Sequence, residues 1–186
     1  MCHLCLRPFE LVVFHQIGSG FEQTCPAGTY CPRRSVSPTT CPGGFYCALG
    51  AWNITACLPG TYCPRGASGP LECPAGYRCG ANASSPQGCG LGLYAGASSS
   101  VCFICPAGSA CPSDVANANH SRCQPGTAAP EASSTCTACS PGWFSSSARA
   151  SECLACAAGR QAPASGAISC TDCVAGKFAA TTNSSN

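Results

Sequence analysis

The cysteines are the residues of this sequence whose type and spacing could do chemistry. There are 21 of them in 186 residues, and closely spaced thiols bind zinc, take part in redox reactions or form structural disulfides. Cys136-x2-Cys139 followed by Cys153-x2-Cys156 has the spacing of a four-cysteine zinc site. The cysteine pattern therefore has to be weighed both as a metal site and as a disulfide framework.

The wider spacing of the cysteines favours disulfides. Two further pairs, Cys102 with Cys105 and Cys170 with Cys173, continue the same overlapping series. The pairs therefore do not divide into separate groups of four, and residues 25–79 contain no such pair at all. The strongest remaining candidate for metal binding is the unusual motif Cys2-His3-x-Cys5.

Residue types used in catalysis are few and badly spaced. His3, His15 and His120 have no acid or nucleophile at a meaningful spacing. No Cys-x2-Cys pair has the strand-to-helix context of a redox enzyme. We therefore predict that the chain is not an enzyme and has no cofactor.

The cysteines belong to a tandem repeat. A cysteine opens each of ten repeats, a glycine follows three residues later in every one, and the opening cysteines are mostly 16 or 17 residues apart. We number the repeats 1 to 10 by these cysteines, which are Cys25, Cys41, Cys57, Cys73, Cys89, Cys105, Cys123, Cys139, Cys156 and Cys173. The glycines in the same order are Gly28, Gly44, Gly60, Gly76, Gly92, Gly108, Gly126, Gly142, Gly159 and Gly176.

This glycine predicts a tight turn in each repeat, because glycine reaches positive φ without steric strain. A proline often precedes it and prepares the turn. An aromatic residue often follows two positions later: Tyr30, Tyr46, Tyr62, Tyr94, Phe144 and Phe178. We expect each aromatic ring to cover the disulfide of its own repeat, and a row of ligand contacts is the alternative.

Each of repeats 1 to 9 contains one further cysteine, which lies either six residues after the opening cysteine or near the end of the repeat. No repeat has both. Every one of these repeats has two cysteines, although the position of the second cysteine differs between repeats. The simplest explanation is that the two cysteines of a repeat bond to each other. The predicted disulfides are Cys25–Cys31, Cys41–Cys47, Cys57–Cys63, Cys73–Cys79, Cys89–Cys102, Cys105–Cys111, Cys123–Cys136, Cys139–Cys153 and Cys156–Cys170.

Two other connectivities stay open. Joining each early cysteine to the next opening cysteine, as in Cys31 to Cys41, would force Cys102 to bond Cys105 across only two residues, which is strained. An interleaved scheme would use four cysteines: Cys102, Cys105, Cys111 and Cys123. Sequence alone does not decide between these schemes.

The repeats resemble a known family of extracellular modules. Cys25-Pro26-Ala27-Gly28-Thr29-Tyr30-Cys31 resembles the ephrin-type receptor-like cysteine-rich repeat, which is similar to the growth-factor-receptor cysteine-rich superfamily. Cys139-Ser140-Pro141-Gly142-Trp143-Phe144, closing at Cys153, resembles the first half of a tumour-necrosis-factor-receptor module. The resemblance covers residues 25–178. It implies an extracellular stalk or binding array without catalytic residues, and it implies no kinase activity.

The composition agrees with a small disulfide-rich fold. With 7 Phe, 5 Tyr, 2 Trp and 1 Met, the chain lacks the large side chains for one ordinary core. The net charge of +2, without basic runs, predicts no nucleic-acid partner, and no stretch is long and apolar enough to enter a membrane. Glycosylation acceptor sequences indicate secretion and N-glycans; they begin at Asn53, Asn82, Asn119 and Asn183.

We expect a linear array of about nine 16–17-residue disulfide-closed repeats, made mostly of turns and irregular extended backbone, with short two-stranded β pieces and little helix. The expected parts are an atypical segment 1–24, four Cys-x5-Cys repeats over 25–88, five mixed repeats over 89–172 and an incomplete repeat over 173–186. The N-terminus lacks a signal-peptide pattern, and Cys173 has no closing cysteine after it, so we expect a fragment of a larger protein.

The sequence predicts a non-catalytic structural or spacer segment of a secreted or cell-surface protein. The alternative is a receptor array that binds a protein ligand. An exposed charged or aromatic stripe at the repeat period would favour binding, and the sequence shows none apart from the aromatic residues already placed over the disulfides.

Overall fold

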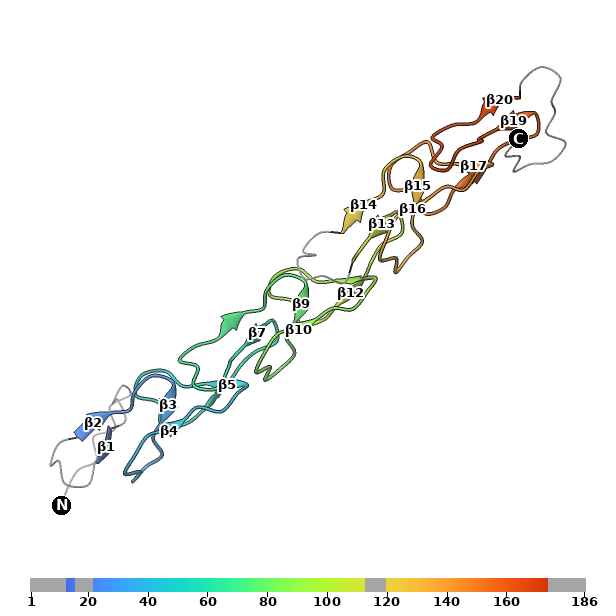
Figure 1. Ribbon diagram of the computed structural model, residues 1–186. Helices are drawn as coiled ribbons and strands as arrows, with labels where there is room; N and C mark the ends of the chain where they lie inside the picture. The colour runs from blue at the N-terminus through green and yellow to red at the C-terminus, as the bar shows by residue number, and fades with distance from the viewer. Residues whose placement is uncertain (1–12, 16–21, 113–119, 174–186) are drawn as a thin grey trace. The chain divides into compact units, whose positions relative to one another are not determined.

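The computed structural model describes residues 13–15, 22–112 and 120–173. These residues form short strands and turns, with no helix among them (Figure 1). The chain divides into two compact units. The first comprises Met1–Pro74, Arg78–Gln87 and Ala97–Val101, and the second comprises Ala75–Tyr77, Gly88–Gly96 and Cys102–Asn186. The predicted class, a small disulfide-rich fold with two-stranded β pieces, is confirmed.

Twenty strands are described, of which β1 and β2 have three residues and the others two. They are β1 Val13–His15, β2 Glu22–Thr24, β3 Thr29–Tyr30, β4 Thr39–Thr40, β5 Phe45–Tyr46, β6 Thr55–Ala56, β7 Thr61–Tyr62, β8 Leu71–Glu72, β9 Tyr77–Arg78, β10 Gln87–Gly88, β11 Leu93–Tyr94, β12 Phe103–Ile104, β13 Ser109–Ala110, β14 Ser121–Arg122, β15 Thr127–Ala128, β16 Thr137–Ala138, β17 Trp143–Phe144, β18 Leu154–Ala155, β19 Arg160–Gln161 and β20 Thr171–Asp172.

Each strand pairs only with its sequence neighbour, so each of repeats 1 to 9 is a single hairpin. In repeat 1 the strands β3 and β4 run antiparallel, with Thr29 opposite Thr40 and Tyr30 opposite Thr39. The N–H of Cys41 extends this ladder by donating to the carbonyl of Gly28 at 3.0 Å. Equivalent bonds from the next opening cysteine are present in all nine repeats.

The first turn of each of repeats 1 to 9 has the geometry predicted for its glycine. In repeat 1 the N–H of Thr29 donates to the carbonyl of Pro26 at 3.1 Å, and Gly28 has a φ of 80°. Positive φ at the third residue of such a turn is the mark of a type II turn and favours glycine. The turn therefore fixes where the hairpin begins.

A second turn with positive φ follows nine or ten residues after the opening cysteine in every repeat whose turn is described. Sequence analysis did not predict it, because glycine occupies the position in only three repeats. The residues at this position are Arg34, Gly50, Gly66, Asn82, Ser98, Ala132, Arg149 and Gly166. Such a position costs a non-glycine residue about 1–2 kcal/mol, so the surrounding contacts must hold it.

Those contacts come from the neighbouring repeat. The N–H of Gly28 donates to the carbonyl of Cys47 at 2.8 Å, and the N–H of Gly50 donates back to the carbonyl of Cys25 at 2.8 Å. The N–H of Cys31 also donates to the carbonyl of Ala51 at 2.9 Å. The same three bonds recur along both compact units. They hold consecutive repeats in a fixed register through backbone atoms alone.

The first-turn glycine also packs against the repeat two positions later. A β-carbon on Gly60 would collide with the carbonyl oxygen of Ser98, and one on Gly126 would collide with that of Gly166. At four further glycines a β-carbon would likewise collide with the carbonyl oxygen of the second-turn residue two repeats later. These glycines are Gly28, Gly44, Gly92 and Gly108. These glycines are therefore required twice, once by their φ and once by the close approach of backbone.

The buried interior consists of disulfides and small residues. Cysteines dominate the buried positions. In repeats whose second cysteine lies near the end, a buried small residue takes the place six residues after the opening cysteine; these residues are Ala95, Ala129, Ser145 and Ala162. The carbonyl of each accepts a hydrogen bond from the first-turn glycine of the preceding repeat, as the carbonyl of Cys47 does. One backbone path thus accommodates both placements of the disulfide.

The aromatic residue of repeat 8 does not cover the disulfide that we expected. Phe144 of repeat 8 packs against the cluster of Cys156, Ala162 and Cys170, which contains the disulfide of repeat 9. The reason is the register between repeats, because the N–H of Gly142 donates to the carbonyl of Ala162 at 2.8 Å. This bond draws β17 along repeat 9, so its ring covers the next disulfide.

Candidate functional site: a groove over the disulfide of repeat 8

The structure pairs eighteen cysteines within their own repeats. The disulfides are Cys25–Cys31, Cys41–Cys47, Cys57–Cys63, Cys73–Cys79, Cys89–Cys102, Cys105–Cys111, Cys123–Cys136, Cys139–Cys153 and Cys156–Cys170. The four cysteines with zinc-like spacing, Cys136, Cys139, Cys153 and Cys156, fall into three of these disulfides. Cys173 is a free, half-buried thiol in the described part of the chain.

The remaining candidates for chemistry are not brought together. No group of three or more His, Cys, Asp and Glu side chains among the described residues is placed to hold a metal ion. His120 lies beside the ring of Tyr94, with ring centroids 5.4 Å apart. Cys2, His3 and Cys5 lie outside the described residues, and His15 is described only as part of β1.

Two of the four predicted glycosylation sites lie in the described residues. Asn53 and Asn82 are both exposed. The side-chain oxygen of Asn53 accepts a hydrogen bond from the N–H of Ile54 at 2.9 Å, and Asn82 occupies the second turn of repeat 4 with a φ of 55°. Asn119 and Asn183 lie outside the described residues. Glycosylation at all four stays a prediction.

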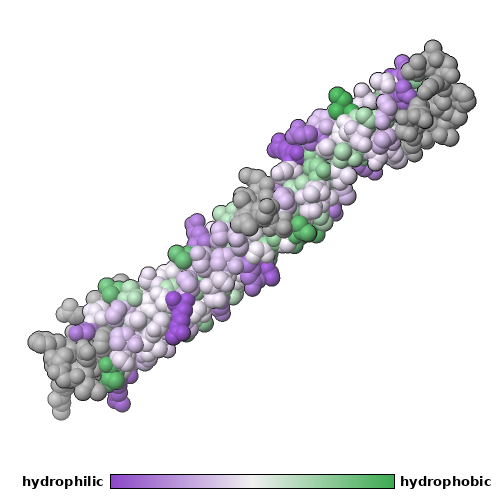
Figure 2. Space-filling view, viewed as in Figure 1, coloured by the Kyte–Doolittle hydropathy of each residue, from purple (hydrophilic) through white to green (hydrophobic). Residues whose placement is uncertain are grey.

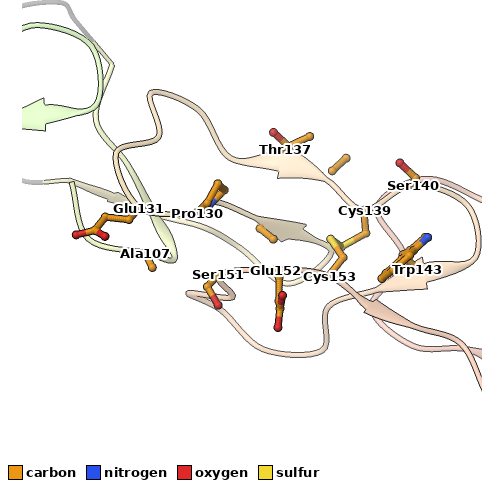
Figure 3. Close-up of a pocket in the computed structure, with 12 residues that line it drawn as sticks. Ala107, Pro130, Glu131, Thr137, Cys139, Ser140, Trp143, Ser151, Glu152 and Cys153 are labelled. Atoms are coloured by element: carbon orange, nitrogen blue, oxygen red, sulfur yellow. A yellow bond between two sulfur atoms is a disulfide. The ribbon is translucent and has the colours of Figure 1, made fainter. Parts of the chain in front are cut away.

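A groove of about 690 Å³ lies in the second compact unit. Ala128, Thr137 and Ala138 line it from repeat 7, and the disulfide Cys139–Cys153 lines it from repeat 8. In Figure 3, Trp143 lies beside this disulfide at one end, Glu131 lies toward the other end, and Glu152 lies between them. An aromatic ring, a disulfide and two carboxylates therefore line the same groove.

Smaller crevices occupy the same place in other repeats. One of about 230 Å³ is lined by Phe144, Ala155 and Cys170, and one of about 200 Å³ is lined by Tyr46, Thr55 and Leu58. Phe144 and Tyr46 are the aromatic residues two positions after the first-turn glycine. The equivalent residue in the large groove is Ala128. The groove is thus a crevice of the array whose aromatic residue is missing.

The charge of the groove has one sign. Glu131 and Glu152 are its only charged lining residues, and both are exposed. The ion pair found among the described residues joins Arg160 to Asp172 at 3.0 Å and involves neither glutamate. The sequence signal for this site was Ala128, one of four non-aromatic residues at this position of repeats 1 to 9, the others being Arg78, Ala110 and Gln161. The signal could be read only after the structure showed that the ring of Phe144 covers the disulfide of the following repeat.

The comparison with known families agrees with this architecture. Residues 126–184 match the family model described as tyrosine-protein kinase ephrin type A/B receptor-like. This part of the chain is therefore similar to ephrin-receptor-like cysteine-rich segments. The match runs from repeat 7 into repeat 10, and it confirms the resemblance for these repeats. A search of curated proteins gave no match to the chain.

The ephrin-receptor-like segment, with its disulfides, is typical of an extracellular or secreted protein of receptor type. Within the described residues, no helix has the length and apolar character to cross a membrane.

Proposed function

We propose that this chain is a non-catalytic spacer segment of an extracellular protein, which holds its repeats at fixed separations. The observation that carries the proposal is the contact between six first-turn glycines and the second-next repeat, as between Gly60 and Ser98. A chain of independent hairpins needs no such contact. Backbone packing across three repeats restricts bending between them, which is what a spacer requires.

The surface supports the same function. Large exposed hydrophobic side chains are present, including Trp52, Leu58 and Leu91. On the face shown in Figure 2, hydrophobic residues form separate small patches. Scattered apolar residues are normal for a soluble surface, whereas a continuous stripe would mark an extended interface. The described aromatic residues that follow the first-turn glycines are half-buried; they are Tyr30, Tyr46, Tyr62, Tyr94 and Phe144.

The proposal is tested by distance measurements inside the first compact unit. Spin labels on unnatural amino acids at the exposed positions Thr39 and Glu72 report the separation of repeats 1 and 3. We expect a narrow distance distribution that broadens in Gly28→Ala, because the new β-carbon would collide with the carbonyl of Gly66. Gly69→Ala is the control, since no atom lies within 4 Å of its β-carbon. A broad distribution in the unaltered chain would rule out a spacer.

A further inference from the structure

We propose that the groove at Trp143 binds an arginine side chain that a partner protein presents. This binding site adds recognition to the spacer function and does not depend on it. The proposal rests on three observations: the aromatic residue that fills equivalent crevices is absent, the floor of the groove is apolar, and its charged residues are all acidic.

The absent aromatic residue leaves an apolar surface uncovered. In repeat 8 the ring of Phe144 packs on the cluster that holds the disulfide Cys156–Cys170. The residue that would cover Cys139–Cys153 in the same way is Ala128 of repeat 7. A methyl group cannot cover the area that a phenyl ring covers. A flat, partly apolar side chain from another molecule can take the vacant place.

The chemistry of the walls selects a guanidinium group. The three methylene groups of arginine match the surface formed by Ala128 and the disulfide. A guanidinium stacks on an indole ring such as that of Trp143, and it donates paired hydrogen bonds to carboxylates such as those of Glu131 and Glu152. Both glutamates are exposed and contribute to no ion pair of the described residues. Their charge is therefore available to an incoming cation.

The next crevice shows an internal example of the same chemistry. Arg160 occupies in repeat 9 the position that Trp143 occupies in repeat 8, and it lines the crevice beside Phe144. Its Nε donates to Asp172 at 3.0 Å. A guanidinium held by a carboxylate at the edge of this crevice is thus compatible with the backbone of the array. A metal ion is less suited, because two carboxylates on separate loops provide too few ligands.

The test follows the two tryptophan indole N–H signals in the NMR spectrum of the whole chain, assigned with Trp52→Phe. The probe is N-acetyl-arginine methylamide, and N-acetyl-citrulline methylamide is its neutral counterpart. We expect the arginine probe to shift the Trp143 signal in a saturable way, with a dissociation constant on the order of millimolar for so small a ligand. Trp52, exposed in the first compact unit, is the internal control and should not shift.

Two variants connect the signal to the groove. Ala128→Phe introduces the aromatic residue that Phe144 provides in repeat 8 and should abolish the shift. Glu131→Gln with Glu152→Gln should weaken binding by about tenfold or more, because both charge-assisted hydrogen bonds are lost. Glu72→Gln, an exposed glutamate in β8, is the matched control and should bind as the unaltered chain does.

The results that overturn the proposal are distinct. Equal shifts with the citrulline probe would show that charge plays no part, and equal shifts of Trp52 would show non-specific binding. Retained binding in both the Ala128→Phe and the double glutamate variants would place the probe elsewhere. A shift of the Trp143 signal by calcium chloride at equal ionic strength, with none by the arginine probe, would replace the arginine site with a cation site.

Discussion

The carbonyl oxygen of Ser98 occupies the space in which a side chain on Gly60 would begin, although the two residues belong to repeats separated by a third. The N–H of Ser98 donates to the carbonyl of Cys73 at 2.7 Å, so the same residue is anchored to the repeat between them. Three repeats are thus joined at one residue. Substitutions at the glycine test this arrangement directly.

Gly60→Ala is expected to destabilise its surroundings by about 2–5 kcal/mol, the sum of positive-φ strain and overpacking. Gly159→Ala, with a φ of 82° but no described atom within 4 Å, should cost only the strain, about 1–2 kcal/mol. Hydrogen exchange at the Ser98 amide measures the first effect. Gly66→Asn should be less destabilising than Gly60→Ala, because its β-carbon meets no backbone atom and asparagine adopts positive φ more readily than alanine, as Asn82 does in the equivalent turn. Equal losses in the two alanine variants would show that the close approach contributes nothing.

Peptide mapping of the unreduced protein should recover the nine pairs that lie within repeats. The discriminating peptides are those around Cys31, because the rival scheme would bond it to Cys41, and those around Cys102, which an interleaved scheme would join to a cysteine of repeat 6. A fragment containing Cys31 bonded to Cys41 would contradict the structure. Mapping a reduced and reoxidised sample alongside provides the control for disulfide exchange.

The placement of the disulfide should be transferable between the two kinds of repeat. Ala95 lies where repeats 1 to 4 carry their second cysteine and is fully buried. Ala95→Cys with Cys102→Ser is therefore expected to form a disulfide between Cys89 and the introduced thiol, and to keep the hairpin of repeat 5. Mass mapping and a free-thiol assay check this. The matched control, Gly96→Cys with Cys102→Ser, should leave two additional free thiols, and equally efficient bonding there would refute the equivalence.

Dithiothreitol should remove the protease resistance of the chain, whereas a chelator alone should not. The reason is that closing a loop of 7 to 15 residues stabilises the fold by roughly 2–3 kcal/mol, and repeats of small residues have little other burial to replace it. Limited proteolysis under both conditions is the measurement. Opening by EDTA, together with protection by zinc under reducing conditions, would mean that the cysteines are metal ligands.

The parts of the fold that sequence could predict are those that repeat without exception. Gly28 and its nine equivalents indicated the first turn. The constant number of two cysteines in each of repeats 1 to 9 suggested pairing within repeats, even though the position of the second cysteine varies. The second turn escaped notice because Arg34, Asn82 and Arg149 stand where Gly50 stands, and the backbone bonds that hold their positive φ come from the adjacent repeat. Those bonds are invisible in a composition dominated by small polar residues.

The candidate groove depends even more on packing between repeats. The sequence shows that Ala128 interrupts the aromatic row, but the ring was expected to cover its own disulfide. Under that expectation the gap would have exposed Cys123–Cys136. The register between repeats moves the gap to Cys139–Cys153 and so brings it beside Trp143 and Glu152. The uncovered disulfide therefore lies one repeat later than the sequence suggested, and different side chains surround it.

The two placements of the second cysteine also change how the protein can be made. During synthesis Cys31 follows Cys25 by six residues, so an oxidase meets both thiols before Cys41 emerges. In repeat 8, by contrast, Cys153 is synthesised fourteen residues after Cys139. Cys156 then follows Cys153 after only three more residues. The nascent chain can then exchange thiols with the wrong neighbour. The first four repeats can oxidise correctly in the order of translation, whereas repeats 7 to 9 place the greater demand on disulfide isomerases.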